Sequence, residues 1–405
     1  MAIFSFLFRH SSKKLINRLK SIQNISRERN ITFVISTKFV IIFSNVKERR
    51  VYMSRLQKVR MKLNELNVEA LLVTEPKNLR YLANFTGSAG VALITADDAY
   101  FITDFRYTEQ AAQQADGYTI RIHQKGTFVE VNNIMKEHGI ETVAIEANQM
   151  NVTDYLMIKE LFDAKLVETQ GLVEKIREIK EEEELALIKA ACEITDQAFE
   201  YILTFVKPGV TELEVANELE AFLKGKGATA MSFDTIVASG TRSAMPHGVA
   251  SDKVIEDGDI VTLDFGCYYK GYSSDLTRTF AVGSIDPKLK EIYHIVLEAH
   301  ERVIQGTKAG MTGKEIDALA RDYITEKGYG DYFGHSTGHG LGLDVHELPA
   351  ISFKNDSPVQ ENMVITNEPG IYVAGLGGVR IENDLVIKAN GVESLNRSPK
   401  DLIIL

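Results

Sequence analysis

The sequence predicts an α/β domain followed by an α+β domain that is internally duplicated. Between residues 54 and 180, short apolar runs alternate with segments of helical spacing, which is typical of a mixed sheet covered by helices. Beyond residue 181, two 21-residue segments that start at Lys207 and Lys308 align without gaps. Both contain Thr-x-x-Glu, the capping box that opens a helix, and both close on glycine. The duplication predicts two halves, each made of two helices followed by strands.

The charge of the chain is divided unevenly between its start and its body. Residues 1–52 carry 11 Lys and Arg against two acidic residues, a net charge of +9, whereas the other residues carry 35 against 54, a net charge of −19. The acidic body argues against nucleic acid as a partner, because phosphate recognition needs clustered Lys and Arg. The two cysteines, Cys192 and Cys267, cannot build a disulfide framework, which favours a reducing, cytoplasmic compartment.

Residues 1–52 form a basic extension without Gly, Pro or Asp. We expect no membrane partner, because its apolar runs at 2–8 and 31–46 are shorter than the roughly 20 residues of a spanning helix. Residues 47–50 can be encoded by purine-only codons that resemble a ribosome-binding site just before Met53. The extension is therefore interpreted as translated upstream sequence outside the native fold, with Met53 as the native start.

Residues 53–180 are expected to form the α/β domain. Leu56, Val59, Leu63 and Leu66 have the spacing of an amphipathic first helix. The expected elements are helix 54–67, strand 70–73, helix 78–84, strands 90–95 and 99–103, helix 107–115, strand 118–123, helix 129–138, strand 142–145, helix 152–162 and strand 165–168. An acidic run at 181–184 suits the first turn of a long helix over 182–205 and marks the boundary to the second domain, residues 181–405.

Two aspartates fall on neighbouring strands of a predicted hairpin over residues 259–280. A two-residue turn at Lys270-Gly271 places Asp264 opposite Thr277 and Asp275 opposite Gly266. The aspartates are then diagonal neighbours on one face, about 7 Å apart at Cβ. Two carboxylates in apolar strands repel unless a cation or a proton lies between them. Taken alone, the pair fits a solvated sheet face equally well.

Two glutamates and a histidine cluster add further candidates. Glu368 ends a strand-like run and precedes Pro369-Gly370, which stops a ladder, whereas Glu382 and Arg380 share one face of the run 378–382. Each glutamate alone would be a surface residue. Three of the nine histidines fall within twelve glycine-rich residues, and such a loop can approach a ligand closely. These are His335, His339 and His346.

Together these residues offer four carboxylates and one imidazole on separate strands. Oxygen-rich ligation of this kind suits Mn²⁺, with Co²⁺ or Zn²⁺ as alternatives, and carboxylates can bridge two ions roughly 3.5–4 Å apart. The segment from His335 to His339 lacks the Glu of a His-Glu-x-x-His motif, which argues against a single-zinc protease of that kind. The predicted ligands are Asp264, Asp275, His339, Glu368 and Glu382.

The motifs are Pro246-His247-Gly248, Asp264 with Asp275, His335 with His339 and His346, Thr366-Asn367-Glu368-Pro369-Gly370, and Arg380-Ile381-Glu382. With these five separated motifs the chain resembles the aminopeptidase P/prolidase family of pita-bread metallopeptidases. Residues 80–87 and 104–107 resemble the creatinase-type domain that precedes the catalytic domain in that family. The resemblance covers residues 54–400 approximately. It implies a creatinase-type α/β domain followed by a pita-bread catalytic domain with a pseudo-twofold duplication.

The resemblance also implies an activity, namely metal-dependent hydrolysis of the Xaa-Pro bond at the N-terminus of peptides, as in aminopeptidase P. Two divalent ions on the five predicted ligands would bridge a hydroxide and polarise the scissile carbonyl. Glu368 would handle the proton of the water, and His247 and His346 would hydrogen-bond the substrate and the tetrahedral intermediate. His335 would support the site or line the pocket, and Arg380 would pair with a metal-bound carboxylate. We expect a homodimer or homotetramer that acts on proline-containing peptides.

Other activities share part of this pattern. A Xaa-Pro dipeptidase (prolidase) has all five motifs, so the sequence leaves aminopeptidase and dipeptidase open. A methionine aminopeptidase shares the metal set but usually lacks an N-terminal domain of this size. A creatinase-like amidinohydrolase has the fold without using the metal set, and a non-catalytic binding protein on this fold would have lost ligands.

Overall fold

The structure is a computed structural model that describes residues 31–36, 39–44 and 53–405. The chain divides into two compact units, Met1–Ser54 and Arg55–Leu405. In the first unit, strands β1 (Ile31–Ser36) and β2 (Phe39–Ser44) form an antiparallel pair. The rest of the predicted basic extension lies outside the described residues. No helix within the described ranges has the length and apolar character needed to cross a membrane.

A six-stranded mixed sheet with the order β6-β5-β4-β3-β7-β8 organises the first part of the second unit. Strands β3, β7 and β8 are parallel, as are β5 and β6, whereas β4 is antiparallel to both of its neighbours. The predicted alternation and mixed sheet are confirmed. In chain order the elements are α2 (Arg55–Leu66), β3 (Ala70–Val73), α3 (Pro76–Ala83), β4 (Val91–Thr95), β5 (Ala99–Thr103), the 3-10 helix η1 (Phe105–Tyr107), α4 (Thr108–Gln114), β6 (Thr119–Ile122), α5 (Thr127–His138), β7 (Thr142–Glu146), α6 (Val152–Leu161), β8 (Lys165–Thr169) and α7 (Leu172–Arg177).

Strand β3 is buried on both faces of this sheet. Because side chains alternate along a strand, Leu71 and Val73 join one core, while Ala70 and Leu72 join another. The first of these cores continues into residues far along the chain, such as Ile188 and Leu341. The six-stranded sheet is therefore joined by a shared apolar core to the part of the chain that carries the candidate site.

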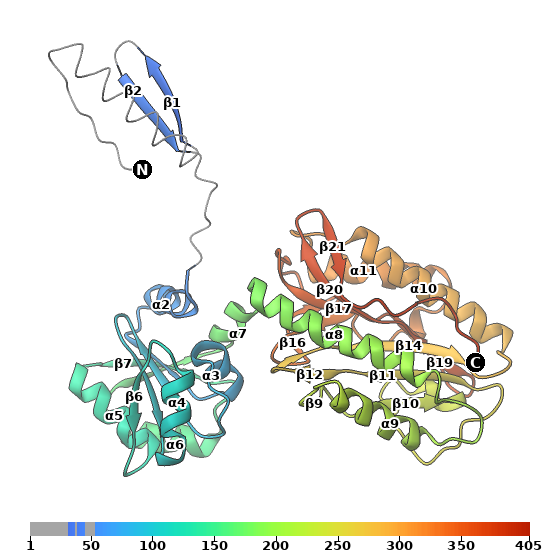
Figure 1. The fold of residues 1–405 in the computed structure, drawn as a ribbon, viewed down its shortest axis with the longest axis horizontal. Coiled ribbons are helices and arrows are strands. Elements are labelled where there is room, and N and C mark those ends of the chain that lie inside the picture. The colour runs from blue at the N-terminus through green and yellow to red at the C-terminus, as the bar shows by residue number, and fades with distance from the viewer. Residues whose placement is uncertain (1–30, 37–38, 45–52) are drawn as a thin grey trace. The chain divides into compact units, whose positions relative to one another are not determined.

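The remaining elements repeat one arrangement, in which two helices are followed by strands. The helix pairs α8/α9 and α10/α11 lie on opposite sides of the strands (Figure 1). The first half contains α8 (Glu182–Ile202), α9 (Glu212–Gly225), β9 (Ala230–Met231), β10 (Ile236–Ser239), the 3-10 helix η2 (Gly240–Ala244), β11 (Ile260–Phe265), β12 (Cys267–Tyr269), β13 (Tyr272–Ser273) and β14 (Leu276–Ala281). The second half contains α10 (Pro287–Gly306), α11 (Gly313–Glu326), the 3-10 helix η3 (Gly330–Tyr332), β15 (Gly338–Gly340), β16 (Glu347–Ile351), β17 (Val364–Asn367), β18 (Gly370–Val373), β19 (Gly377–Arg380), β20 (Asn383–Lys388) and β21 (Gly391–Ser394).

Both aligned segments adopt the structure that their shared sequence predicts. Helices α9 and α11 open with a complete capping box, at Thr211 and Thr312 respectively. Each is followed by a glycine in the left-handed region, Gly227 at φ 102° and Gly328 at φ 83°, where a residue with a Cβ would be strained. The predicted duplication is therefore present in the fold.

The predicted hairpin of the first half is confirmed in its turn and in its register. Asp264 lies opposite Thr277 in the β11–β14 ladder, and Tyr269 lies opposite Tyr272 across the Lys270-Gly271 turn. Its ladder is nevertheless interrupted between these two parts, and β12 and β13 join β9 in a separate sheet. Asp275 lies at this interruption, which the sequence pattern did not predict.

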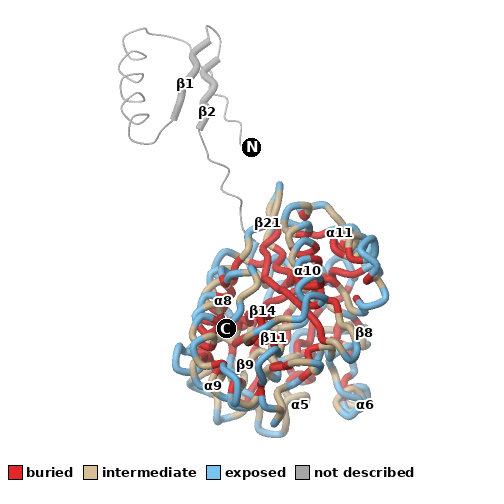
Figure 2. The backbone as a smooth tube through the Cα atoms, turned by 90° about the vertical axis from the view of Figure 1, so that its right-hand side faces the viewer, coloured by how far each residue is buried: buried red, intermediate tan, exposed pale blue. Residues whose placement is uncertain are grey.

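The second half contains an interruption of the same kind. The β17–β20 ladder ends where Asn367 lies opposite Asn383, and the β18–β19 ladder resumes where Gly370 lies opposite Arg380. The common register places Glu368 opposite Glu382 within the gap. The backbone N–H of Glu382 donates to the carbonyl oxygen of Thr277 at 3.1 Å, which joins the two halves at their interruptions. Strands β11 and β14 are buried along their whole lengths, so this junction lies in the interior (Figure 2).

We predict that Gly266→Ala is destabilising, because a Cβ at position 266 would overlap the carbonyl oxygen of Ser274. Overpacking of this kind typically costs ~1–3 kcal/mol of unfolding free energy. Chemical denaturation measures the change. Gly391→Ala is the matched control, because a Cβ there meets no atom within 4 Å. Equal unfolding free energies for the two variants would contradict the prediction.

Candidate metal centre

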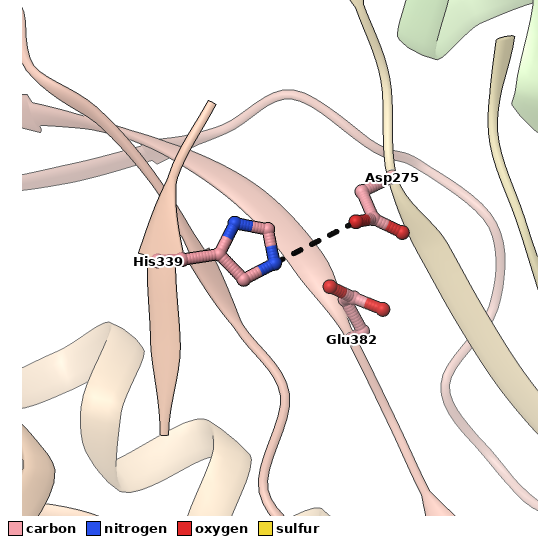
Figure 3. A group of neighbouring side chains, drawn as sticks. All are labelled: Asp275, His339 and Glu382. Atoms are coloured by element: carbon pink, nitrogen blue, oxygen red, sulfur yellow. Dashed lines mark ion pairs between the residues drawn. The ribbon is translucent and has the colours of Figure 1, made fainter. Parts of the chain in front are cut away.

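The five predicted ligands meet at the junction of the two halves. Figure 3 shows Asp275, His339 and Glu382 directed toward one another from three separate segments. Each of these three residues offers an oxygen or nitrogen atom within 4.8 Å of the others. Glu368 joins them, since its Oε1 lies 3.4 Å from Nε2 of His339. Asp264, near the end of β11, completes the cluster and is close enough to raise the pKa of Asp275, Glu368 and Glu382.

His339 presents a neutral imidazole to the carboxylates. Its Nδ1 lies 3.1 Å from the carbonyl oxygen of Gly340, so the Nδ1–H donates there and the lone pair stays on Nε2. That Nε2 is 3.7 Å from Oδ2 of Asp275. Burial, together with His346, lowers the pKa of His339 to about 4, so the ring is uncharged at neutral pH. A backbone-oriented, neutral imidazole is the form that binds metal ions.

Three of the carboxylates have one oxygen tied to the protein or directed into the cluster and one oxygen without a partner. Arg380 Nη2 donates to Oδ2 of Asp264 at 2.6 Å, and Thr277 Oγ1 donates to Oε2 of Glu382 at 2.6 Å. Within the described part of the chain, the other oxygens of these residues, Oδ1 and Oε1, are buried without a hydrogen bond, as is Oδ1 of Asp275. A buried charged oxygen without a partner is costly. A divalent cation in the cluster would satisfy all three, so the residues present fit the metal that the sequence predicts.

The clustering of these acids changes their protonation. Burial raises the pKa of Asp275 well above its usual range, with added repulsion from Glu382 and Asp264. Burial and the neighbouring Glu368 do the same for Glu382. Burial also raises the pKa of Glu368 to about 8, where Arg380 opposes the shift and Asp264 adds to it. Without a metal ion, the cluster therefore retains protons at neutral pH.

Arg380 connects the cluster to its surroundings. Its guanidinium donates to Asp264, to Oγ1 of Thr277 at 3.0 Å, to the hydroxyl of Tyr372 at 2.6 Å and to the carbonyl oxygen of Pro246 at 3.2 Å. The pairing of Arg380 with a carboxylate of the predicted set therefore exists. The Arg380 guanidinium thus holds the strand of Asp264, the hydroxyl of Tyr372 and the loop that carries His247.

His335 lies beside the carboxylate cluster and contacts Tyr372. Its Nδ1–H donates to the carbonyl oxygen of Ser336 at 2.8 Å, and its Nε2 is 2.9 Å from the Tyr372 hydroxyl. Burial, with Arg380 nearby, lowers the pKa of His335 to about 4, so the neutral Nε2 accepts a hydrogen bond from the Tyr372 hydroxyl. Burial raises the pKa of Tyr372 to about 12, which keeps that proton on the hydroxyl. Sequence reasoning missed Tyr372, whose only signal is its place in a short alternating run.

The remaining two histidines are exposed near the cluster. The ring of His346 packs edge-on against His339, with 4.4 Å between ring centroids and an angle of 70° between planes. Burial lowers the pKa of His346, Asp264 opposes the shift and His247 adds to it. His247 follows η2 and is anchored through the carbonyl oxygen of Pro246. Both exposed rings therefore lie beside the cluster.

Two further residues that the sequence did not indicate hold the ligands in place. Thr277 binds Glu382 and Arg380 through one hydroxyl. Asp384, which is fully buried, accepts a hydrogen bond from the backbone N–H of Asp275 at 2.9 Å and one from the thiol of Cys192 at 3.2 Å. These contacts orient the acids from outside the cluster.

A duplicated α+β domain with an oxygen-rich metal centre at the junction of its halves defines a metallopeptidase of the pita-bread fold. The family model of metallopeptidase family M24 matches residues 186–389. The model of the creatinase/prolidase N-terminal domain matches residues 55–179. The chain belongs to metallopeptidase family M24. The expected fold, a creatinase-type α/β domain followed by a pita-bread catalytic domain, is confirmed.

Relatives match nearly the whole of this arrangement. The solved structure of a Xaa-Pro dipeptidase from Bacillus anthracis is 55% identical, with a TM-score of 0.86, over 87% of this chain and 99% of that one. A structure of an X-Pro aminopeptidase from Thermotoga maritima is 43% identical, with a TM-score of 0.80, over 85% of this chain and 100% of that one. A Xaa-Pro dipeptidase from Pyrococcus furiosus is 40% identical over 86% of this chain and 99% of the relative.

We predict that the stabilisation by a divalent metal increases with pH. A carboxyl whose pKa is raised in the folded state stabilises the fold below its unfolded pKa, and this contribution is lost as the pH rises through the folded pKa. For Glu368 the window runs from 4.5 to about 8. The metal-free protein should therefore have a lower Tm at pH 8 than at pH 6, and Mn²⁺ should raise the Tm more at pH 8.

Thermal unfolding with and without Mn²⁺ at the two pH values checks this expectation. Calorimetric titration in two buffers of different ionisation enthalpy should show proton release on binding, because the metal displaces protons from the carboxylates. A Tm increase that is smaller at pH 8 than at pH 6 would contradict the prediction.

Proposed function

We propose that this protein is a metal-dependent Xaa-Pro dipeptidase. The observation that carries the proposal is the buried cluster of four carboxylates and one neutral imidazole, with three carboxylate oxygens left for a cation. The dipeptidase activity is favoured over the aminopeptidase P-like activity that the sequence suggested first, because Xaa-Pro dipeptidases are among its relatives at 55% and 40% identity. The 43% identical X-Pro aminopeptidase keeps cleavage of longer peptides as the second candidate.

The metal centre is proposed to consist of two divalent ions, most simply Mn²⁺, with Co²⁺ or Zn²⁺ as alternatives. Asp264, Asp275, His339, Glu368 and Glu382 would hold them. When bound, the ions supply an electrophile for the scissile carbonyl and lower the pKa of the attacking water. We also propose a cytoplasmic homodimer or homotetramer, a location consistent with two free, buried cysteines.

Glu368 is proposed to move the proton during hydrolysis. Its Oε1 faces Nε2 of His339, and its side chain is 18% exposed, so substrate and water can reach it. It would accept a proton from the attacking water and deliver it to the proline nitrogen as the C–N bond breaks. Bound cations would keep this carboxyl ionised and ready to accept the proton, because they lower the pKa of the groups that they bind.

His247 and His346 are proposed to hydrogen-bond the substrate carbonyl and the oxyanion that develops from it. Donors fixed before the substrate arrives stabilise this charge without reorganising. Arg380 would keep Asp264 in place, and His335 would fix Tyr372 beside it. Proline after the scissile bond has no N–H and a fixed φ, so a shaped pocket can select it.

We predict that Glu368→Gln lowers kcat by ~10²–10⁴-fold on an Xaa-Pro dipeptide with little change in KM, because the amide cannot transfer the proton. Steady-state kinetics checks this, and metal analysis of the purified variant shows whether ions are retained. Glu361→Gln, at an exposed position, is the control and should keep wild-type kinetics. Full activity of the metal-loaded Glu368→Gln variant would remove the proposed proton transfer.

We predict hydrolysis of Xaa-Pro dipeptides in the presence of Mn²⁺, with slower cleavage of Xaa-Pro-Yaa and none of Met-Ala. Removal of the metal with a chelator should abolish activity, and added Mn²⁺ should restore it. Product analysis by chromatography distinguishes the three substrates. Faster cleavage of Xaa-Pro-Yaa would move the assignment to aminopeptidase P, and activity that survives chelation would exclude a metal-dependent reaction.

A further inference from the structure

The loop that carries His346 is held by two cationic side chains, those of Arg177 and Lys180, from the end of the N-terminal domain. Arg177, the last residue of α7, places Nη2 at 2.6 Å from Oδ2 of Asp344 and at 2.6 Å from Oε2 of Glu347. Nζ of Lys180 lies 2.7 Å from Oε1 of Glu347. Because His346 stands between these two acids in the sequence, both ends of its segment are tied.

The two pairs that Glu347 makes are buried on both sides, whereas Asp344 in the third pair is 34% exposed. The side chains of Arg177 and Lys180 are 3% and 1% exposed, and that of Glu347 is 7% exposed. Burial alone would raise the pKa of Glu347, but Lys180 and Arg177 outweigh it and lower that pKa. Exposed pairs contribute little because water screens them, whereas loss of one partner from a buried pair leaves an uncompensated charge. The arrangement is therefore rigid and specific.

Arg177 is itself held from behind by the six-stranded sheet. Its Nη1 donates to Oδ1 of Asn78 at 2.9 Å, and Nδ2 of Asn78 donates to Oε1 of Glu146 at 2.7 Å. The other oxygen of Glu146 accepts from the backbone N–H groups of Thr74 and Glu75 at 2.7 and 2.9 Å. Glu146 ends β7 and Thr74 follows β3, so a continuous path of hydrogen bonds runs from two central strands to the loop.

The opposite side of the loop is fixed by the catalytic domain. Ser273 donates to the carbonyl oxygen of Gly342 from both its hydroxyl and its backbone N–H, each at 2.9 Å. A Cβ at position 342 would lie 2.5 Å from Oε1 of Glu347, so the glycine lets that carboxylate pack close. Because the backbone is held on both sides, the position of His346 depends on its side-chain torsion angles alone. Its ring packs against that of His339.

We propose that Arg177 is a positioning residue for the peptidase reaction, which fixes the loop that presents His346 to the substrate. The inference rests on the proposed function, because the role of His346 belongs to it. Through this contact the N-terminal domain takes part in catalysis by holding a loop of the catalytic domain, in addition to any effect on the length of the substrate.

Kinetics of five variants test the proposal with an Xaa-Pro dipeptide and Mn²⁺. Arg177→Met should lower kcat by ~10–100-fold with a smaller change in KM, since small misplacements of a catalytic group have effects of this size. Arg177→Lys should recover part of the loss. The double variant Arg177→Met/His346→Ala should be no slower than His346→Ala, because the arginine acts through the histidine. Arg121→Met is the matched control, since Arg121 pairs with Glu130 and Glu137 away from the loop, and it should keep wild-type kinetics.

Hydrogen exchange provides a readout that does not depend on activity. The backbone amides of residues 341–347 should exchange faster in Arg177→Met than in the wild type. Their exchange rates should be unchanged in Arg121→Met. If Arg177→Met does not fold, Arg177→Lys and Glu347→Gln carry the same comparison.

Unchanged exchange, or kinetic losses that multiply in the double variant, would overturn the proposal. A wild-type protein without Xaa-Pro hydrolysis would instead overturn the proposed function, while the exchange data would still report whether Arg177 holds the loop.

Discussion

The burial of four carboxylates in one place is the constraint on which the catalytic domain depends. Asp264 and Asp275 come from one half of the domain, and Glu368 and Glu382 come from the other. Like charges that are shielded from water repel one another strongly. A protein therefore retains such a cluster only if protons or cations occupy it. The neutral His339 adds a ligand without adding charge. The surrounding contacts serve to hold these groups in a geometry that a divalent ion can satisfy.

The two halves meet this constraint by the same device. In each, a pair of antiparallel strands loses its ladder for a few residues while the register is kept. Asp275 lies in one gap, and Glu368 faces Glu382 in the other. The register that is kept places the acids of each half on one face, and the interruption leaves room between them. The loop with His247 is anchored by a further buried carboxylate, because Glu212 accepts hydrogen bonds from the backbone N–H groups of Ser239 and Ser251 on either side of it.

Sequence patterns predicted what depends on local or paired residues. Helices and strands of the first domain follow from alternation, and the Lys270-Gly271 turn fixed the partner of Asp264. The five ligands were grouped by the chemistry of their side chains and by the resemblance, because no periodicity relates segments that lie so far apart in the chain. Tyr372, Asp384 and Arg177 were missed for the same reason: each acts through a partner distant in the chain, as Arg177 does with Glu347. The interruption beside Asp275 was not predicted, whereas Pro369-Gly370 did indicate that a ladder stops after Glu368.

The equal division of the acids between the halves bears on how such a site could arise. A chain with only one half of the catalytic domain would carry one interrupted strand pair and two of the carboxylates. It would complete the centre only by pairing with a second copy of itself. Such a centre would form in proportion to the square of the concentration of the chain and would be lost on dilution. Joining the halves in one chain makes its assembly intramolecular. Each half is then free to change separately, and the contacts of the loop with His346 to Arg177 and Lys180 belong to the second half.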